Sequence, residues 1–296
     1  MYMRHGLISS LSAICLMVLM LSCGNKGQVS SSGSVDSLSV DSVATEVDEE
    51  VCIDSIKTDT VSFSKEDGIY KFSLVADYPV AGPDSVVKKI REFINDFFGG
   101  AYEGSLADGN GMIARNGEMS FGNFLELCGD ADLEEVNELF QYKSVNKGYE
   151  TGKFVTFNVW VSQYTGGLHG IGFEEGHTFS KVNGQCFGYE MMRNLDTPAF
   201  KQLIKEGLKR FFTSEDAKEL ISDNDLLQEL VSYSGSADEI PLPDNEPYMT
   251  EKGVTFIYQP YEISYYAAGK PEFTISYDIV RPYLTHQAIE LFMPGK

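Results

Sequence analysis

The chain has 296 residues, with 23 Lys and Arg against 44 Asp and Glu and a formal net charge of −21 at pH 7. Such an acidic chain repels phosphate backbones and anionic headgroups, so nucleic acid is excluded as an expected partner. The charge would instead attract a cationic protein or peptide. Solubility in a crowded compartment is the alternative reason for it.

The first 22 residues have the pattern of a secretory signal peptide. An apolar run from Leu7 to Leu21 follows Arg4, and it is short for a membrane span but typical of a signal-peptide core. The run ends in Leu-Ser-Cys-Gly, which resembles a lipoprotein cleavage box with Cys23 as the lipidated residue. An ordinary secretory signal with an incidental cysteine is the alternative.

Residues 23–62 are rich in Ser, Val, Asp and Glu, and they show no periodicity. This composition predicts a disordered acidic tether between the lipid and a folded domain. Gly24 rather than Asp follows Cys23, a lipoprotein sorting pattern that does not indicate retention at the inner membrane. We therefore expect a lipid anchor in the outer membrane, on the side facing the periplasm.

The folded part begins with a predicted strand from Tyr70 to Pro79 and a helix from Asp84 to Phe98. The helix has an apolar stripe that must pack on a sheet, and glycines end it. Residues 99–129 are rich in Gly and poorly periodic. Asp132 to Lys143 is predicted as a short acidic helix, with Asp132 and Glu135 as a capping box.

Residues 154–164 alternate in a way that predicts a central strand with both faces partly covered. The dipeptide Asn183-Gly184 predicts a two-residue hairpin between 177–182 and 185–189.

The C-terminal part has a second clear helix, opened by Thr197 and Pro198 and followed by shorter helices at 214–221 and 225–233. A proline-containing loop is predicted at 234–247. Alternating residues at 254–259 and 273–277 then predict two strands, with a short helix at 278–284. The connection between the strands is too long for a tight hairpin and too aromatic for a solvated linker, so we expect it to pack on its own domain.

These elements predict an α+β fold of two small lobes, residues 63–190 and 191–296. The sheets are expected to be mostly antiparallel, with helices packed on one face.

Two segments carry a resemblance to known proteins. Residues 261–269, YEISYYAAG, resemble the C-terminal signature of the extracytoplasmic domain of the RsiV family. Residues 164–170, YTGGLHG, resemble the Gly-Gly-Ala-His segment of the PdaC-type domain that usually precedes it. In RsiV the related region binds lysozyme and so senses it. The resemblance therefore implies lysozyme or another cationic protein as a partner, and it implies no enzymatic activity.

The candidate ligand-binding residues are aromatic. Tyrosine offers a large contact area with a polar tip, which suits recognition of a protein or a sugar. The alternative is that the same rings pack the loop onto its own sheet. The set consists of Tyr258, Tyr261, Tyr265, Tyr266 and His169.

The sequence predicts no catalytic residue, metal or cofactor. His169 and His177 lie near Glu174 and Glu175, but zinc needs three or four convergent ligands and no known zinc spacing is present. Nucleophile-elbow and phosphate-loop motifs are absent as well. The metal motifs of PdaC-type deacetylases are also missing, so deacetylase activity is not implied.

The leading hypothesis is a non-catalytic envelope lipoprotein whose acidic domain binds a ligand. An envelope enzyme acting on peptidoglycan or another glycan is one alternative, and an outer-membrane assembly or structural factor is another. The sequence also leaves open a disulfide between Cys128 and Cys186, the two cysteines of the predicted folded part.

Overall fold

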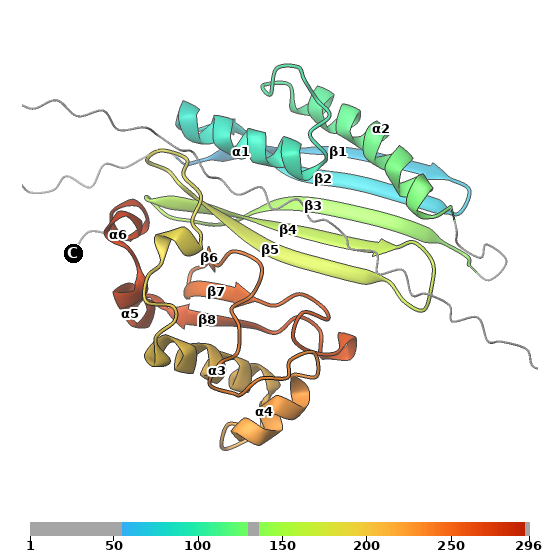
Figure 1. Cartoon of the computed structure of the whole chain (residues 1–296). Helices are drawn as coiled ribbons and strands as arrows, with labels where there is room; N and C mark the ends of the chain where they lie inside the picture. Colours follow the sequence, from blue (N-terminus) through green and yellow to red (C-terminus); the bar gives the residue numbers. More distant parts are fainter. Residues whose placement is uncertain (1–54, 130–135, 294–296) are drawn as a thin grey trace, which may run out of the picture. The chain divides into compact units, whose positions relative to one another are not determined.

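The computed structural model describes residues 55–129 and 136–293, all within one compact unit (Figure 1). The predicted signal peptide, Cys23 and most of the predicted tether lie outside the described residues. None of the helices in the described part of the chain combines the length and apolarity that crossing a bilayer requires.

The first sheet has five strands in the order β1-β2-β3-β4-β5. Neighbouring strands are antiparallel except for the parallel pair of β2 and β3, which requires a long crossover. Helices α1 (Asp84–Phe97) and α2 (Gly109–Leu127) form that crossover and cover one face of the sheet (Figure 1). The strands are β1 (Lys57–Asp67), β2 (Tyr70–Ala81), β3 (Leu139–Glu150), β4 (Phe154–Tyr164) and β5 (Ile171–Ser180).

Strand β1 corrects the predicted extent of the tether. Residues 57–62 were expected in the tether, yet they form the first half of β1 and pair with β2. Val61 is the one buried residue of this strand, so the strand shows little of the burial alternation that would reveal it.

Helix α2 occupies a segment that the sequence predicts as irregular. Its glycines lower helix propensity, but they let the helix lie close to the sheet. A β-carbon at Gly109 would lie 2.6 Å from the ring of Tyr78, and one at Gly117 would overlap the ring of Phe63. Asp108 caps the helix by accepting a hydrogen bond from the N–H of Gly111 at 2.8 Å. The close packing of α2 against the sheet therefore outweighs the low helix propensity of its glycines.

The acidic helix predicted at 132–143 is wrong where the structure describes it. Residues 136–138 are irregular and β3 begins at Leu139, because this segment is held between β2 and β4 by ladder hydrogen bonds. The two capping-box residues lie outside the described ranges.

The predicted hairpin at Asn183-Gly184 is also wrong in form. Strand β5 ends at Ser180, and the returning chain makes only an isolated bridge between Phe179 and Cys186. A two-residue type I′ turn needs positive φ at both central residues, and of the two only Gly184 has it, at 76°.

The second sheet contains β6 (Tyr248–Met249), β7 (Gly253–Ile257) and β8 (Glu272–Ser276), all antiparallel. The predicted second helix is confirmed as α3 (Pro198–Phe212), whose N-terminus is capped by Thr197.

The helix predicted at 214–221 is wrong, since these residues form turns and bends and Thr213 Oγ1 accepts the N–H of Ile221. The remaining helices are α4 (Asp223–Glu229), α5 (Tyr277–Val280) and α6 (His286–Phe292), and short 3-10 turns lie at Tyr189–Met191, Tyr266–Ala268 and Arg281–Tyr283.

The two sheets meet through a small buried polar network. Thr156 Oγ1 donates to the carbonyl of Met249 at 2.7 Å, and the N–H of Met249 donates to Thr178 Oγ1 at 2.8 Å. Helices α1 and α2 cover the first sheet on its far side, and α3 lies beyond the second sheet (Figure 1). The predicted α+β class with mostly antiparallel sheets is confirmed.

Candidate functional site

The first half of the candidate site is the loop of residues 165–170, which joins β4 to β5. Gly166 and Gly167 have φ values of 105° and 93°, a region that residues with a β-carbon rarely adopt. The hydroxyl of Tyr164 donates to the carbonyl of Gly167 at 2.8 Å and fixes the bend. The loop therefore presents Leu168 with a fully exposed side chain. His169 follows it.

The second half is the connection between β7 and β8, residues 258–271. Its ends are closed by the N–H of Tyr258, which donates to the carbonyl of Pro271 at 2.9 Å. Inside it, the carboxylate of Glu262 accepts the N–H groups of Gln259 at 2.6 Å and Asp244 at 2.7 Å. The connection is packed, as the sequence predicts: Ser264 donates to the carbonyl of Glu229 at 2.5 Å within the C-terminal part. It also contacts the first sheet, since Gln259 donates to the carbonyl of Glu174 at 2.6 Å.

His169, Tyr266 and Tyr261 form what we call the aromatic stack. The ring centroids of His169 and Tyr266 lie 4.0 Å apart with planes inclined by 19°, and those of Tyr266 and Tyr261 lie 5.6 Å apart at 28°. The Tyr266 hydroxyl also donates to the carbonyl of Gly170 at 2.8 Å. The stack thus joins the loop of the first sheet to the connection of the second.

Both ring nitrogens of His169 are occupied. Nδ1 lies 2.8 Å from the carbonyl of Gly170, to which it can only donate. That tautomer leaves Nε2 to accept from the hydroxyl of Tyr261 at 2.9 Å. The imidazole is held as a structural ring, with no nitrogen directed at solvent as a free base.

Tyr261 has an unusual backbone. Its φ is 71°, and Asn194 is the other non-glycine residue with positive φ in the described ranges. For a residue with a large side chain this conformation costs about 1–2 kcal/mol. The residue is nevertheless 49% exposed. A strained backbone that holds a side chain exposed is typical of functional sites, where such strained residues concentrate.

Acidic groups and one lysine lie on the connection that carries the tyrosines of the stack and on strands β5 and β8. Lys270 Nζ forms an ion pair with Glu174 Oε2 at 2.6 Å, and Gln259 bonds the backbone of Glu174 through both ends of its amide. Burial raises the pKa of Glu262, although it accepts two N–H groups. Burial, with the nearby Glu174 charge, likewise raises the pKa of Glu272. No spacing in the sequence signals this arrangement.

The other predicted site residues lie apart from the stack. Tyr258 is buried, its hydroxyl donates to the carbonyl of Pro241 at 2.6 Å, and burial raises its pKa. It therefore supports a neighbouring loop rather than contacting a ligand. Tyr265 is exposed, but its hydroxyl turns to Glu229 Oε2 at 2.8 Å. Cys23 lies outside the described residues.

The remaining histidine and cysteine candidates do not converge. His177 packs on the helix-covered face of the first sheet, with its ring centroid 4.3 Å from that of Phe93. Cys128 is a free thiol whose pKa is raised by burial, so the bridge to Cys186 that the sequence leaves open is not formed. Across residues 55–129 and 136–293, no three His, Cys, Asp or Glu side chains are grouped to hold a metal ion.

Part of the chain is similar to a known protein family. Residues 195–278 match the family model described as "Protein of unknown function (DUF3298)". We call these residues the DUF3298 segment. It contains α3, the second sheet and the connection that carries Tyr261 and Tyr266. No curated protein sequence matches the chain.

Solved structures of DUF3298 proteins share the fold. A family member from Bacteroides fragilis NCTC 9343 is 17% identical with a TM-score of 0.56, and the match covers 82% of this chain and 100% of that one. A family protein from Pseudomonas aeruginosa PAO1 is 14% identical with a TM-score of 0.56, covering 83% and 100%. At these identities the likeness establishes the fold alone. It extends beyond the DUF3298 segment.

Proposed function

We propose that the protein is a non-catalytic envelope lipoprotein whose aromatic stack binds a cationic protein. The observation that carries this is the strained backbone of Tyr261, which holds an exposed ring against His169 and Tyr266. A packing role alone would be served by a buried ring with ordinary φ.

The chemistry of the stack suits a basic partner. The face of an exposed tyrosine ring attracts a lysine or arginine side chain, with about 0.5–1 kcal/mol at exposed sites. The exposed Leu168 beside it offers an apolar contact, and Glu174 and Glu262 supply negative charge on the same two loops and strands. The net charge of −21 would steer a basic protein toward this surface.

The choice of lysozyme as the partner rests on the resemblances to the RsiV and PdaC-type domains. Both resemblance segments contribute to the stack, His169 from one and Tyr261 with Tyr266 from the other. We take lysozyme as the probe partner for that reason. The anchor is proposed to be a lipid on Cys23, in the outer membrane facing the periplasm.

Titration of the full chain with lysozyme by calorimetry at low and moderate salt tests the binding proposal. Measurable affinity at low salt, weakened at moderate salt, is expected because exposed charges are screened. Tyr261→Ala should weaken binding about tenfold, as expected for an exposed aromatic anchor. Tyr149→Ala is the matched control, since Tyr149 is also exposed but lies at the opposite end of the first sheet. Absence of binding at low salt would reject lysozyme as the partner.

The anchor is tested separately. Cells expressing the full chain should incorporate labelled palmitate, and Cys23→Ser should abolish the label. Unlabelled wild-type protein would refute the anchor without touching the binding proposal.

A further inference from the structure

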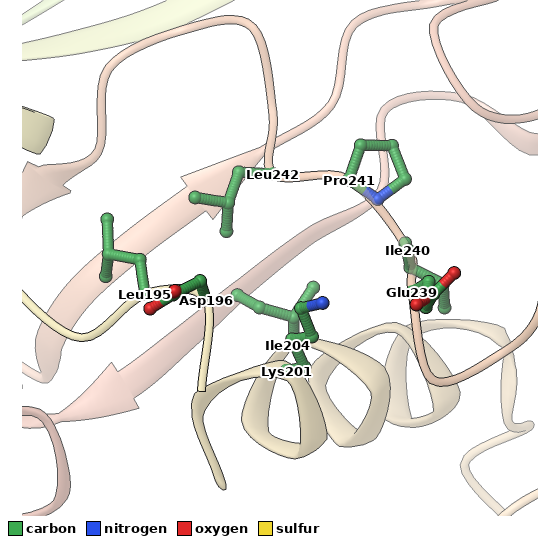
Figure 2. A pocket seen from close by; sticks show the side chains of 8 residues that line it. All are labelled: Leu195, Asp196, Lys201, Ile204, Glu239, Ile240, Pro241 and Leu242. Carbon is green, nitrogen blue, oxygen red and sulfur yellow. The ribbon is translucent and has the colours of Figure 1, made fainter. Parts of the chain in front are cut away.

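A groove in the DUF3298 segment shares no lining residue with the aromatic stack. Two adjoining cavities of about 330 and 420 Å³ share Asp196, Lys201 and Glu239 as lining residues. Figure 2 shows the first of them, between Lys201 and Ile204 of α3 and the facing residues Glu239 to Leu242. These volumes lie at the lower end of the range for ligand pockets.

The two ends of the groove differ in chemistry. The first cavity has an aliphatic lining from Leu195, Ile204, Ile240 and Leu242. The second is polar and includes Asp238 and Gln202 together with the shared Asp196 and Glu239. An aliphatic side chain fits the first end, and a hydrogen-bonding or charged group fits the second.

The charge of the lining is negative. The second cavity is lined by three carboxylates and by the ammonium of Lys201, for which the described residues provide no ion pair; of the carboxylates, those of Asp196 and Glu239 are unpaired there. The carboxylate of Asp238 is bound by Lys205 at 2.5 Å, but Lys205 also binds Asp223 at 3.1 Å and is therefore shared. The polar end thus favours a cation, and Lys201 is left to donate to a carbonyl.

The wall opposite α3 is held in place. The carbonyl of Pro241, on the groove loop, accepts the hydroxyl of the buried Tyr258 at 2.6 Å. Tyr189 fixes the same loop two residues on, by donating to the carbonyl of Pro243 at 3.0 Å. A preformed wall lowers the ordering cost of binding.

We propose that this groove binds a peptide segment in which an aliphatic residue adjoins a lysine or arginine. The aliphatic side chain enters between Leu195, Ile240 and Leu242. The basic side chain lies over Asp196 and Glu239, and the ammonium of Lys201 donates to the peptide carbonyl between them. Charge complementarity selects this occupant over an acidic or a purely apolar one.

The test uses a synthetic acetylated peptide amide, Lys-Leu-Leu-Lys, with a diazirine analogue in place of one leucine. Glu-Leu-Leu-Glu and Lys-Ser-Ser-Lys serve as control peptides. Irradiation with the full chain should crosslink the first peptide to Leu195, Ile240 or Leu242, as read by mass spectrometry. Fluorescence anisotropy should show binding of Lys-Leu-Leu-Lys and at least fivefold weaker binding of both controls.

Variants decide whether the groove is responsible. Glu239→Lys should weaken the binding of Lys-Leu-Leu-Lys about fivefold or more, since it reverses a charge beside the cationic side chain. Glu215→Lys makes the same change on an exposed residue beyond the other end of α3 and should leave binding unchanged. Equal weakening by both variants, or no binding, would overturn the proposal. Crosslinks at Tyr261 or Tyr266 would also overturn it while leaving the proposed function of the stack intact.

Discussion

His169 and Tyr266 stack with ring centroids 4.0 Å apart, although the first follows β4 and the second follows β7. The contact makes one surface from two loops that belong to different sheets. Tyr261 adds the third ring and a hydrogen bond to the same imidazole. The geometry therefore depends on both loops keeping their conformations.

Replacing Tyr261 should separate binding from stability. Asparagine tolerates positive φ better than tyrosine, so Tyr261→Asn relieves strain of about 1 kcal/mol while it removes the ring. Urea denaturation should show unchanged or slightly higher stability, and lysozyme binding should fall about tenfold. Tyr265→Asn is the control, because the φ of Tyr265 is −73° and no strain is relieved there. A clear loss of stability in Tyr261→Asn would mean that the ring serves packing alone.

The sequence predicts elements well where local signals and packing agree. Helices α1 and α3 have strong apolar stripes and recognisable first residues, and β4 matches its predicted bounds. Strand β1 and helix α2 escape prediction because their conformations come from neighbours. Strand β1 pairs along β2 but buries few of its side chains. Helix α2 lies close to the sheet because its glycines have no β-carbon.

The site follows the same division. The sequence identifies His169, Tyr261 and Tyr266 as candidates by their residue types and by the resemblance to known families. It cannot predict that their rings touch, because that contact forms only where the two sheets pack together. The pairing of Lys270 with Glu174 has no local signature at all. The groove is equally hidden, because Leu195 and Ile204 look like core residues and Asp196 looks like surface.

Two glycines of α2 should respond in opposite directions to alanine. Gly117→Ala places a β-carbon into the ring of Phe63, and overpacking of this kind costs about 1–3 kcal/mol. Gly122 lies on the same helix with open space around it, so Gly122→Ala should add about 0.5–1 kcal/mol through helix propensity. Thermal unfolding followed by circular dichroism measures both. Similar effects of the two changes would show that α2 does not approach the sheet this closely.

Glu150 should make stability depend on acid pH. Burial alone would raise its pKa, but hydrogen bonds from Lys147, the N–H of Ile56, Lys181 and Ser55 outweigh burial and hold the pKa at about 2. The unfolded value is about 4.3. The folded state thus binds this proton less readily, so the carboxylate contributes stability above about pH 4.3. That contribution is lost as pH falls from there toward 2.

Glu150→Gln tests this dependence. Urea denaturation at neutral pH should show a loss of roughly 2–3 kcal/mol, because the nearly buried ammonium of Lys181 loses its counter-charge. The difference from wild type should shrink as pH falls from about 4.3 toward 2. Glu138→Gln removes the exposed ion pair with Lys71 and should leave the free energy of unfolding nearly unchanged. A pH-independent difference for Glu150→Gln would place its effect in packing.

The threonine network between the sheets should make the two sheets unfold together. Thr178 accepts the N–H of Met249 and contacts the hydroxyl of Thr156 at 2.7 Å, all within buried surroundings. Thr178→Val keeps the shape but leaves that N–H without a partner, at a cost of about 1–3 kcal/mol. Thr274→Val is the control, since Thr274 bonds Thr255 within the second sheet and does not join the two sheets.

Calorimetry of the wild type should show one cooperative transition for residues of both sheets. Thr178→Val should lower its midpoint or split it into two, whereas Thr274→Val should leave it single. Two transitions already present in the wild type would mean that the contacts between the sheets are too weak to couple them.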